Sequence, residues 1–347
     1  MNMDLYETLK IVAPGTPLRE GLDNIINARI GALIVLGNTK EVLDIVHGGF
    51  YINCEYTPSN IYELAKMDGA IILSTDLKRI IYANSQLLPC HHIHSKETGT
   101  RHKTAERVAK QTNTLVISIS QKREIITLYK GNYKYILKDI NEILNRTNQG
   151  VQTMEKYRKA LDQVISTLTL SEFQNSTTLY DVVKAIQKME MVLRIGREID
   201  IYISELGTEG RLFNMQVIEL KEGVEEDCIN LVRDYVKNGN ENYTSIYNRF
   251  GSLSANELLD LNQIANLLGY DDGLRTLDIK VKPKGYRILN KIPRIPNYVI
   301  ENIINSFDSF QHIINASVDQ MDQVEGVGQI RSINIVEGLK RYKEQFS

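Results

Sequence analysis

A short apolar run bracketed by glycines constrains the first part of this chain most. Gly31-Ala-Leu-Ile-Val-Leu-Gly37 contains no polar side chain, and such a run is typical of a strand that is buried on both faces. Ala70–Leu73, Ile80–Tyr82 and Leu115–Ser120 have a similar character. Because strands of this kind need cover on both sides, the pattern predicts an α/β domain over residues 1–140, with a mixed central sheet flanked by helices.

A hairpin and a helix complete this prediction. Ile125–Tyr129 follows Ser120 after a four-residue polar turn, which predicts two antiparallel neighbouring strands. Between the preceding strand segments, Ala105, Val108 and Ala109 mark the apolar face of a helix that starts near Arg101.

From about residue 141 the apolar residues recur at helical spacing instead. Steps of three and four residues run through 151–168, 179–189 and 258–268, and they predict an all-α middle domain over residues 141–284. We expect a turn at Asp271–Gly273 and a short basic linker at Lys280–Lys284.

The last segment, residues 285–347, resembles a weak internal duplication. Ile292-Pro-Arg-Ile-Pro296 precedes one apolar helix, and Val324-Glu-Gly-Val-Gly328 precedes another. Two units of helix, short loop and helix, about thirty residues apart, predict a third, helical domain.

Candidate binding residues are concentrated in the run Glu97–Arg107. Arg101, His102 and Lys103 stand at the expected helix start, just after Gly99, where cations oppose the helix dipole at a cost of a few tenths of a kcal/mol or more. Three in a row are better explained by a bound anion, and N–H groups, hydroxyls and cations together suit a phosphate chain. The alternative is that Thr100 and Thr104 cap the helix and that the cations are a solvated face.

A second candidate is Asp68-Gly69-Ala70, at the head of a predicted strand. It is either a plain turn or a sheet-edge carboxylate that holds a divalent metal or activates a ribose hydroxyl. In the latter case Gly69 would let a flat ligand approach the backbone. Ser118 and Ser120 share one face of a strand, in the core or toward the phosphates.

Val324–Gly328 fits the hairpin of a helix-hairpin-helix module. In such a hairpin, glycines let consecutive backbone N–H groups point at a DNA phosphate, and here Gly326, Val327, Gly328 and Arg331 would make the contact. Seven Lys/Arg and seven Asp/Glu leave residues 285–347 formally neutral. This balance favours the alternative of a purely structural turn, and it predicts that any DNA binding is modest and salt-sensitive.

Composition and charge exclude several classes of protein. A net charge of −2 excludes a polycationic protein, and the absence of an apolar run of about eighteen residues argues against a membrane span. Three widely spaced cysteines, with no C-x-x-C pair, are not a disulfide framework or a zinc ribbon. We therefore expect a cytoplasmic protein.

Taken together, these segments resemble the DNA integrity scanning family, diadenylate cyclases of the DisA type. Asp68–Ala70 and Gly99–His102 are similar to the paired signature of the cyclase domain. Ile199–Arg211 is similar to the central helical domain, and Ile292–Pro296 with Val324–Gly328 to the C-terminal helix-hairpin-helix domain.

The resemblance implies condensation of two ATP into cyclic di-AMP and two pyrophosphates with Mg²⁺ or Mn²⁺, in a homo-octamer with facing cyclase domains. It implies branched DNA, bound without sequence preference, as a partner that modulates synthesis. Asp68 would ready the 3′-hydroxyl or hold its metal, with Arg101 and His102 as further catalytic residues. The nucleotide contacts it implies are Gly69, Ala70, Leu87, Thr100, Arg101, His102, Lys103, Thr104 and Ser120.

One residue departs from the family pattern. The family has Arg-His-Arg where this chain has Arg101-His102-Lys103, and lysine keeps the charge but loses the bidentate fork. Two other hypotheses stay open: a branched-DNA scaffold that senses ATP or cyclic di-AMP without turnover, and a C-terminal segment that is only structural.

Overall fold

The computed structural model describes residues 3–237, 242–270 and 275–346, so the turn predicted at Asp271–Gly273 lies outside the described residues. The chain divides into two compact units. One comprises Met1–Asn148 with Asp200–Asn214, and the other Gln149–Ile199 with Met215–Ser347. In the described parts of the chain, no helix is long and apolar enough to cross a membrane.

The first unit is built on one mixed sheet. Its described strands follow the order β2-β5-β4-β1-β6-β7-β8, with β3 also paired to β5. β1 runs parallel to β4, and the other pairings are antiparallel. The strands are β1 (Ala32–Leu36), β2 (Val46–His47), β3 (Phe50–Glu55), β4 (Ala70–Leu73), β5 (Arg79–Leu87), β6 (Leu115–Ser120), β7 (Ile125–Lys130) and β8 (Tyr133–Ile136).

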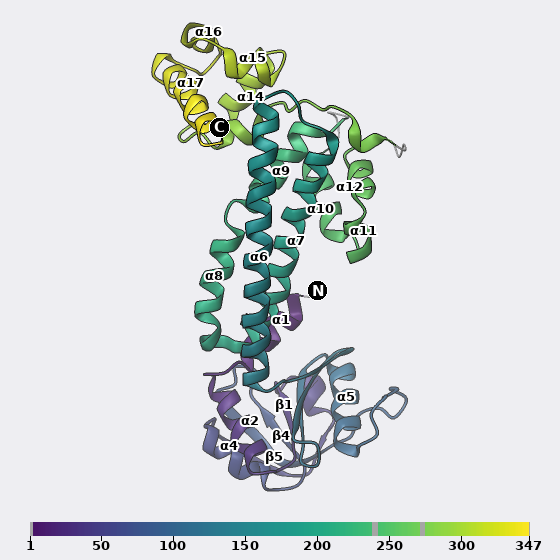
Figure 1. The fold of residues 1–347 in the computed structure, drawn as a ribbon. Helices are drawn as coiled ribbons and strands as arrows, with labels where there is room; N and C mark the ends of the chain where they lie inside the picture. Colours follow the sequence, from purple (N-terminus) through teal and green to yellow (C-terminus); the bar gives the residue numbers. More distant parts are fainter. Residues whose placement is uncertain (1–2, 238–241, 271–274, 347) are drawn as a thin grey trace. The chain divides into compact units, whose positions relative to one another are not determined.

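Helices cover both faces of this sheet. α2 (Pro17–Asn27) and α4 (Pro58–Ala65) lie on one face, and α5 (Thr100–Thr112) lies on the other (Figure 1). The unit also contains the short helices α1 (Met3–Ile11) and α3 (Lys40–Leu43). Burying each large aliphatic side chain between these layers contributes about 1.5–3 kcal/mol. The expected α/β domain with a mixed sheet is confirmed.

The core divides by strand alternation into two clusters. Ile34 and Ile117 face α2 and α4, whereas Val35 and Val116 face α5 together with Ala105. The predicted hairpin of β6 and β7 is present, and α5 starts one residue before Arg101.

The helical part of the chain is as expected in kind. Its elements are α6 (Ile140–Phe173), α7 (Leu179–Leu206), η1 (Gly207–Gly210), α8 (Arg211–Lys221), α9 (Val224–Tyr235), α10 (Tyr243–Ser252), α11 (Ala255–Leu259), α12 (Leu261–Leu267) and η2 (Thr276–Asp278). The periodic run 258–268 is not one helix, because Asp260 is extended and its side chain caps α12 at the Asn262 N–H. The predicted linker is irregular apart from an isolated antiparallel bridge between Lys280 and Thr178, and the Val281 N–H donates to the Thr177 carbonyl.

Five helices end the chain: α13 (Tyr286–Asn290), α14 (Asn297–Ser306), α15 (Phe310–Asn315), α16 (Val318–Asp322) and α17 (Gln329–Glu344). The loops before α14 and α17 share one backbone feature, a residue with a positive φ. Arg294 has φ 68° and Gly326 has φ 82°, at the same position of each loop and thirty-two residues apart. A left-handed backbone conformation is unusual for arginine. Its presence at the same position of both loops therefore supports the duplication inferred from the two motifs.

A buried ionic cluster holds α13 within the second unit. Arg287 and Glu172 are both 0% exposed and form an ion pair. Asp234 accepts hydrogen bonds from the backbone N–H groups of Gly285, Tyr286 and Arg287 at 2.7, 2.7 and 3.1 Å. The final helices therefore share one compact unit with parts of α6 and α9, and the boundary at 284/285 stays a prediction.

Candidate nucleotide-binding site

The strand registers bring several predicted residues to one edge of the sheet. Leu33 of β1 pairs with Ala70 of β4 in parallel, while Ala70 pairs with Ser85 of β5 in antiparallel. Ala32 pairs with Ile119 near the end of β6. The starts of β1 and β4 thus lie beside the ends of β5 and β6, and this edge carries Asp68, Gly69, Ala70, Leu87 and Ser120.

The first turn of α5 reaches the same edge. A Cβ on Gly31, just before β1, would lie 2.2 Å from Nη1 of Arg101 and 3.0 Å from its Cζ. The guanidinium of Arg101 therefore lies directly against the backbone at the start of β1. This contact, invisible in the sequence, joins the two predicted motifs in one place.

The start of α5 is not capped by a side chain. Gly99 is the N-cap residue and makes no side-chain cap hydrogen bond, so the alternative that Thr100 caps the helix is wrong. The first N–H groups of a helix have no partner within it, and together with the positive end of the helix dipole they suit an anion. Thr100 and Lys103 are exposed, and Thr104 is half-buried.

Gly69 is required by packing. Its φ is +94°, and a Cβ there would lie 2.8 Å from the backbone carbonyl carbon of Asn84 and 2.9 Å from the carbonyl oxygen of Ser85. Asn84 itself has φ 53° at a register shift between β4 and β5. Only glycine fits between these strands, and the exposed Asp68 is thereby fixed at the sheet edge.

Asp68 is also the candidate metal ligand. Among the described residues, no group of three or more His, Cys, Asp or Glu side chains could hold a metal ion. A single exposed carboxylate nevertheless fits Mg²⁺, which keeps several water ligands and shares substrate phosphates with one or two protein carboxylates.

The other predicted contacts differ in exposure. Ala70 and Leu87 are buried. Ser120 is half-buried, and its hydroxyl accepts a hydrogen bond from the Arg123 N–H at 3.2 Å. Ser118 is 0% exposed, so it belongs to the layer beneath α5 and not to the surface.

His102 is held by two residues that sequence reasoning missed. Its Nδ1 lies 3.0 Å from the Tyr129 hydroxyl, and this hydroxyl also hydrogen-bonds to Glu97. Lys134 pairs with Glu97 at 2.5 Å. Because side chains alternate along a strand, Tyr129 shares a face of β7 with Thr127, the partner of Ser118, but this register is visible only in the structure.

These contacts shift the pKa values of the group. Burial lowers the pKa of His102, and Glu97 offsets this only in part. Burial and the neighbouring Glu97 raise the pKa of Tyr129 far above its usual value. Burial alone would raise the pKa of Glu97, but hydrogen bonds from Lys134 and Tyr129 lower it. At neutral pH the three are a neutral imidazole, a phenol and a carboxylate.

Part of the predicted cationic run has another role. The Arg107 side chain donates to the carbonyls of Ile93 and His91 at 3.0 and 3.2 Å, and Lys110 donates to the carbonyl of His94 at 2.9 Å. Arg107 therefore holds the preceding loop onto α5.

The predicted DNA contacts lie in the second unit. Gly328 is the N-cap of α17 and makes no side-chain cap hydrogen bond, while Val327 is 3% exposed. Arg331 donates to the carbonyl of Gly326 at 2.8 Å, so its guanidinium braces the loop. A Cβ on Gly326 would lie 3.0 Å from the ring of Tyr298.

Comparison with known proteins agrees with these features. Residues 19–133 match the family described as DisA bacterial checkpoint controller nucleotide-binding, and residues 137–277 match the DisA bacterial checkpoint controller linker region. The DNA integrity scanning protein DisA of Clostridium botulinum (strain Alaska E43 / Type E3) is 55% identical over 99% of this chain and 96% of its own. Its counterpart in Clostridium beijerinckii is 54% identical over the same shares.

A solved structure of DacA from Staphylococcus aureus covers 41% of this chain and 94% of its own, at 21% identity and a TM-score of 0.31. The two relatives match almost end to end, and the two family regions follow each other in order along the chain. The chain therefore belongs to the DisA family of DNA integrity scanning proteins.

Proposed function

We propose that this protein is a diadenylate cyclase that condenses two ATP molecules into cyclic di-AMP. The 3′-hydroxyl of each ATP attacks the α-phosphorus of the other. Two phosphodiester bonds form, two bonds between α- and β-phosphates break, and two pyrophosphates leave. The observation that supports this most is the convergence of Arg101, the uncapped start of α5 and Asp68 at one sheet edge.

Phosphoryl transfer needs positioning and charge neutralisation more than covalent chemistry. The N–H groups of the first turn of α5, with Arg101, Lys103, Thr100 and Thr104, would hold the phosphates. Gly69, Ala70, Leu87 and Ser120 would flank the nucleoside. Asp68 would orient the attacking 3′-hydroxyl and hold Mg²⁺ or Mn²⁺, which supplies positive charge to the phosphates when it is bound.

In this proposal the sheet edge of one subunit binds one nucleotide. Because the reaction joins two ATP molecules, the cyclase domains of two subunits must face each other. The resemblance extends this to an octamer, and we expect the assembly to work in the cytoplasm. Light scattering of the purified protein tests the assembly directly, and a monomer that still forms cyclic di-AMP would refute the facing arrangement.

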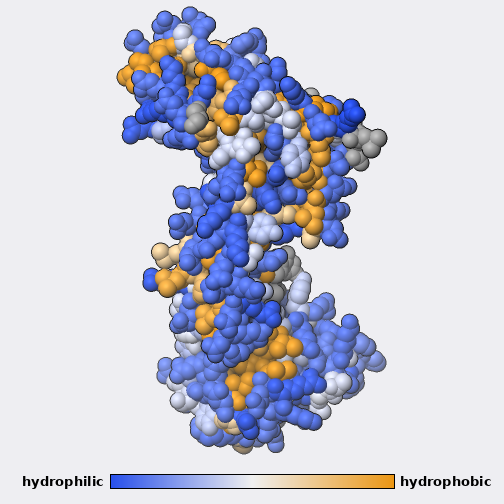
Figure 2. Space-filling view, viewed as in Figure 1, coloured by the Kyte–Doolittle hydropathy of each residue, from blue (hydrophilic) through white to orange (hydrophobic). Residues whose placement is uncertain are grey.

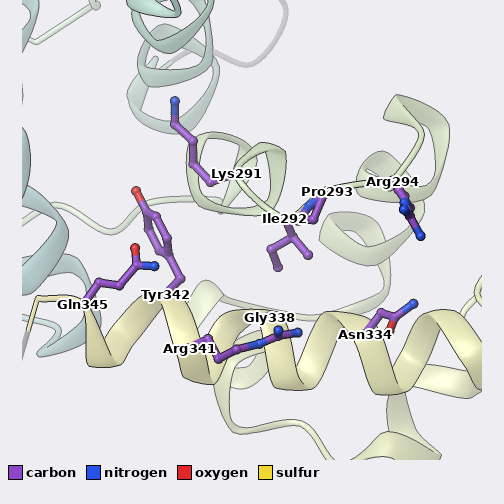
Figure 3. A pocket seen from close by; sticks show the side chains of 9 residues that line it. All are labelled: Lys291, Ile292, Pro293, Arg294, Asn334, Gly338, Arg341, Tyr342 and Gln345. Carbon is purple, nitrogen blue, oxygen red and sulfur yellow. The ribbon is translucent and has the colours of Figure 1, made fainter.

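We further propose that the C-terminal helices bind the backbone of branched DNA. A groove of about 390 Å³ lies between the 291–294 segment and α17, and its cations are Lys291, Arg294 and Arg341 (Figure 3). Apolar surface gathers over these helices (Figure 2), where Ile330 is 79% exposed. The cations of this groove and the name of the relatives, DNA integrity scanning protein, support a contact to the DNA backbone.

The decisive experiment incubates the purified protein with ATP and Mg²⁺ or Mn²⁺, with and without a four-way DNA junction. We expect cyclic di-AMP from the wild type, none from Asp68→Asn, and an altered rate with the junction. ATP binding with no product under either metal would support the non-catalytic scaffold instead. Junction affinity that Gly326→Ala leaves unchanged at low salt would support a purely structural hairpin.

A further inference from the structure

The hydrogen bonds around Tyr129 determine where His102 carries its proton. The Tyr129 hydroxyl has one hydrogen and two partners, Glu97 and Nδ1 of His102. Glu97 is paired with Lys134 at 2.5 Å, so it is a carboxylate and can only accept. Tyr129 therefore donates to Glu97 and accepts from the Nδ1–H of His102. In a neutral imidazole the other nitrogen, Nε2, then carries a lone pair.

The burial of Nε2 also limits what this atom can bind. This atom is buried and finds no hydrogen-bond partner among the described residues. The hydroxyls of Ser118 and Thr127 are also buried and have no hydrogen-bond partner within the described ranges. They belong to directly paired residues on the face of the sheet that α5 covers. A lone pair enclosed in this layer cannot donate to a phosphate oxygen, which offers only acceptors.

The cluster also ties four segments together at one point. Glu97 comes from the loop before α5, His102 from its first turn, Tyr129 from β7 and Lys134 from β8. Arg101 and Lys103 flank His102 directly in the chain. Holding the imidazole against the sheet therefore fixes the rotation of the helix turn that carries both cations.

We propose that Glu97 and Tyr129 are positioning residues of the nucleotide site. They hold His102 against the sheet, so that Arg101 and Lys103 meet the phosphates while His102 acts as an internal anchor. The inference rests on the proposed function and narrows it, because it removes His102 from the set of phosphate ligands that the family resemblance implies.

The first test is a double-mutant cycle on nucleotide affinity in the full-length protein. Its probe is α,β-methylene-ATP with Mg²⁺, which cannot be cleaved at the α–β bond. We expect Tyr129→Phe and His102→Ala each to weaken binding about tenfold, as for one lost hydrogen bond. The double variant should bind the analogue about as tightly as the more impaired of the two single variants, because both changes break the same contact between His102 and Tyr129. A double effect equal to the product of the two would overturn the proposal.

The second test uses pH, because a His102 whose Nδ1–H is given to Tyr129 can donate to a phosphate through Nε2 only when that nitrogen is also protonated. The charged groups acting on His102 are Glu97, Lys134, Arg123 and Arg101. For an anchor, the affinity ratio of wild type to His102→Ala stays the same from about pH 6 to pH 8.5. For a cationic ligand, the ratio is largest at low pH and falls toward one as the pH rises. The second outcome would contradict the inference.

Tyr180→Phe, which removes an exposed hydroxyl in the other compact unit, is the matched control and should bind like the wild type. Where Tyr129→Phe fails to fold, Glu97→Gln replaces it in the cycle, since it keeps the shape of the carboxylate. Binding is measured without turnover, so a wild type that binds the analogue but makes no cyclic di-AMP refutes the proposed activity and still decides the role of His102.

Discussion

Gly31→Ala should impair the proposed cyclase although Gly31 is not itself among the proposed nucleotide contacts. The new methyl group would lie 2.2 Å from Nη1 of Arg101, and ordinary contact begins at 3.4 Å, so the guanidinium must move by about 1.2 Å. A displacement of this size at a phosphate-binding group costs up to about 100-fold in rate. The charge-assisted hydrogen bonds at risk are worth about 1.5–3 kcal/mol.

Stability should change little, because the clash is with the end of a flexible side chain and Gly31 does not have a left-handed φ. We expect kcat/KM for cyclic di-AMP synthesis to fall about 10- to 100-fold, while the midpoint of thermal unfolding stays within a few degrees. Steady-state rates with ATP and Mn²⁺, and a melting curve for each variant, measure both.

Arg101→Ala provides the reference for this prediction. If Gly31 acts only through Arg101, then Gly31→Ala has no further effect in an Arg101→Ala background. Gly251→Ala, at a helical glycine with open space around it, is the control and should retain full activity. An active Gly31→Ala, or an equal loss in both backgrounds, would refute the reasoning.

Three further substitutions have expected outcomes. Gly69→Ala combines a left-handed φ with a Cβ 2.8 Å from the backbone of Asn84, so its free energy of unfolding should fall by about 1–3 kcal/mol; denaturant titration measures this, and an unchanged midpoint would contradict it. Arg287→Met leaves Glu172 as an unpaired buried charge, at a cost of about 3–5 kcal/mol, whereas Arg287→Met with Glu172→Leu should recover much of the loss in the same titration. Lys103→Arg restores a bidentate fork at an exposed position; it should lower KM for ATP several-fold with kcat nearly constant, and a raised KM would show that the lysine is preferred.

Local pattern was sufficient for the interior of the sheet. β1, β4 and β6 are continuous apolar or nearly apolar runs, and their observed bounds agree closely with the predicted segments. β5 was read only at Ile80–Tyr82 because buried and exposed residues alternate along the rest of the strand. β3 was missed because Phe50 and Tyr51 are 59% and 65% exposed, and no core imposes a pattern on residues that face solvent.

The site was predictable in its parts and not in its assembly. The cations at the start of α5 and the turn at Gly69 could be read from the sequence because each has a local physical reason. That Arg101 lies on Gly31, and that His102 meets Tyr129 twenty-seven residues later, depends on strand order and register. The sequence on either side of these residues does not encode the two contacts, so no rule based on local sequence could predict them.

The buried ionic cluster at α13 has a consequence for anyone who shortens the gene. A stop codon after Lys284 would remove the Arg287 guanidinium, which pairs with Glu172. It would also remove the three backbone N–H groups that donate to Asp234. Two carboxylates would lose these partners, and the apolar Phe173, which packs against the removed helices, would become exposed to water. Such a truncated product should be cleared by proteases before the loss of the proposed DNA contact can matter. Nonsense alleles there would therefore report on protein survival, and only point changes in the hairpins can test the proposed DNA contact.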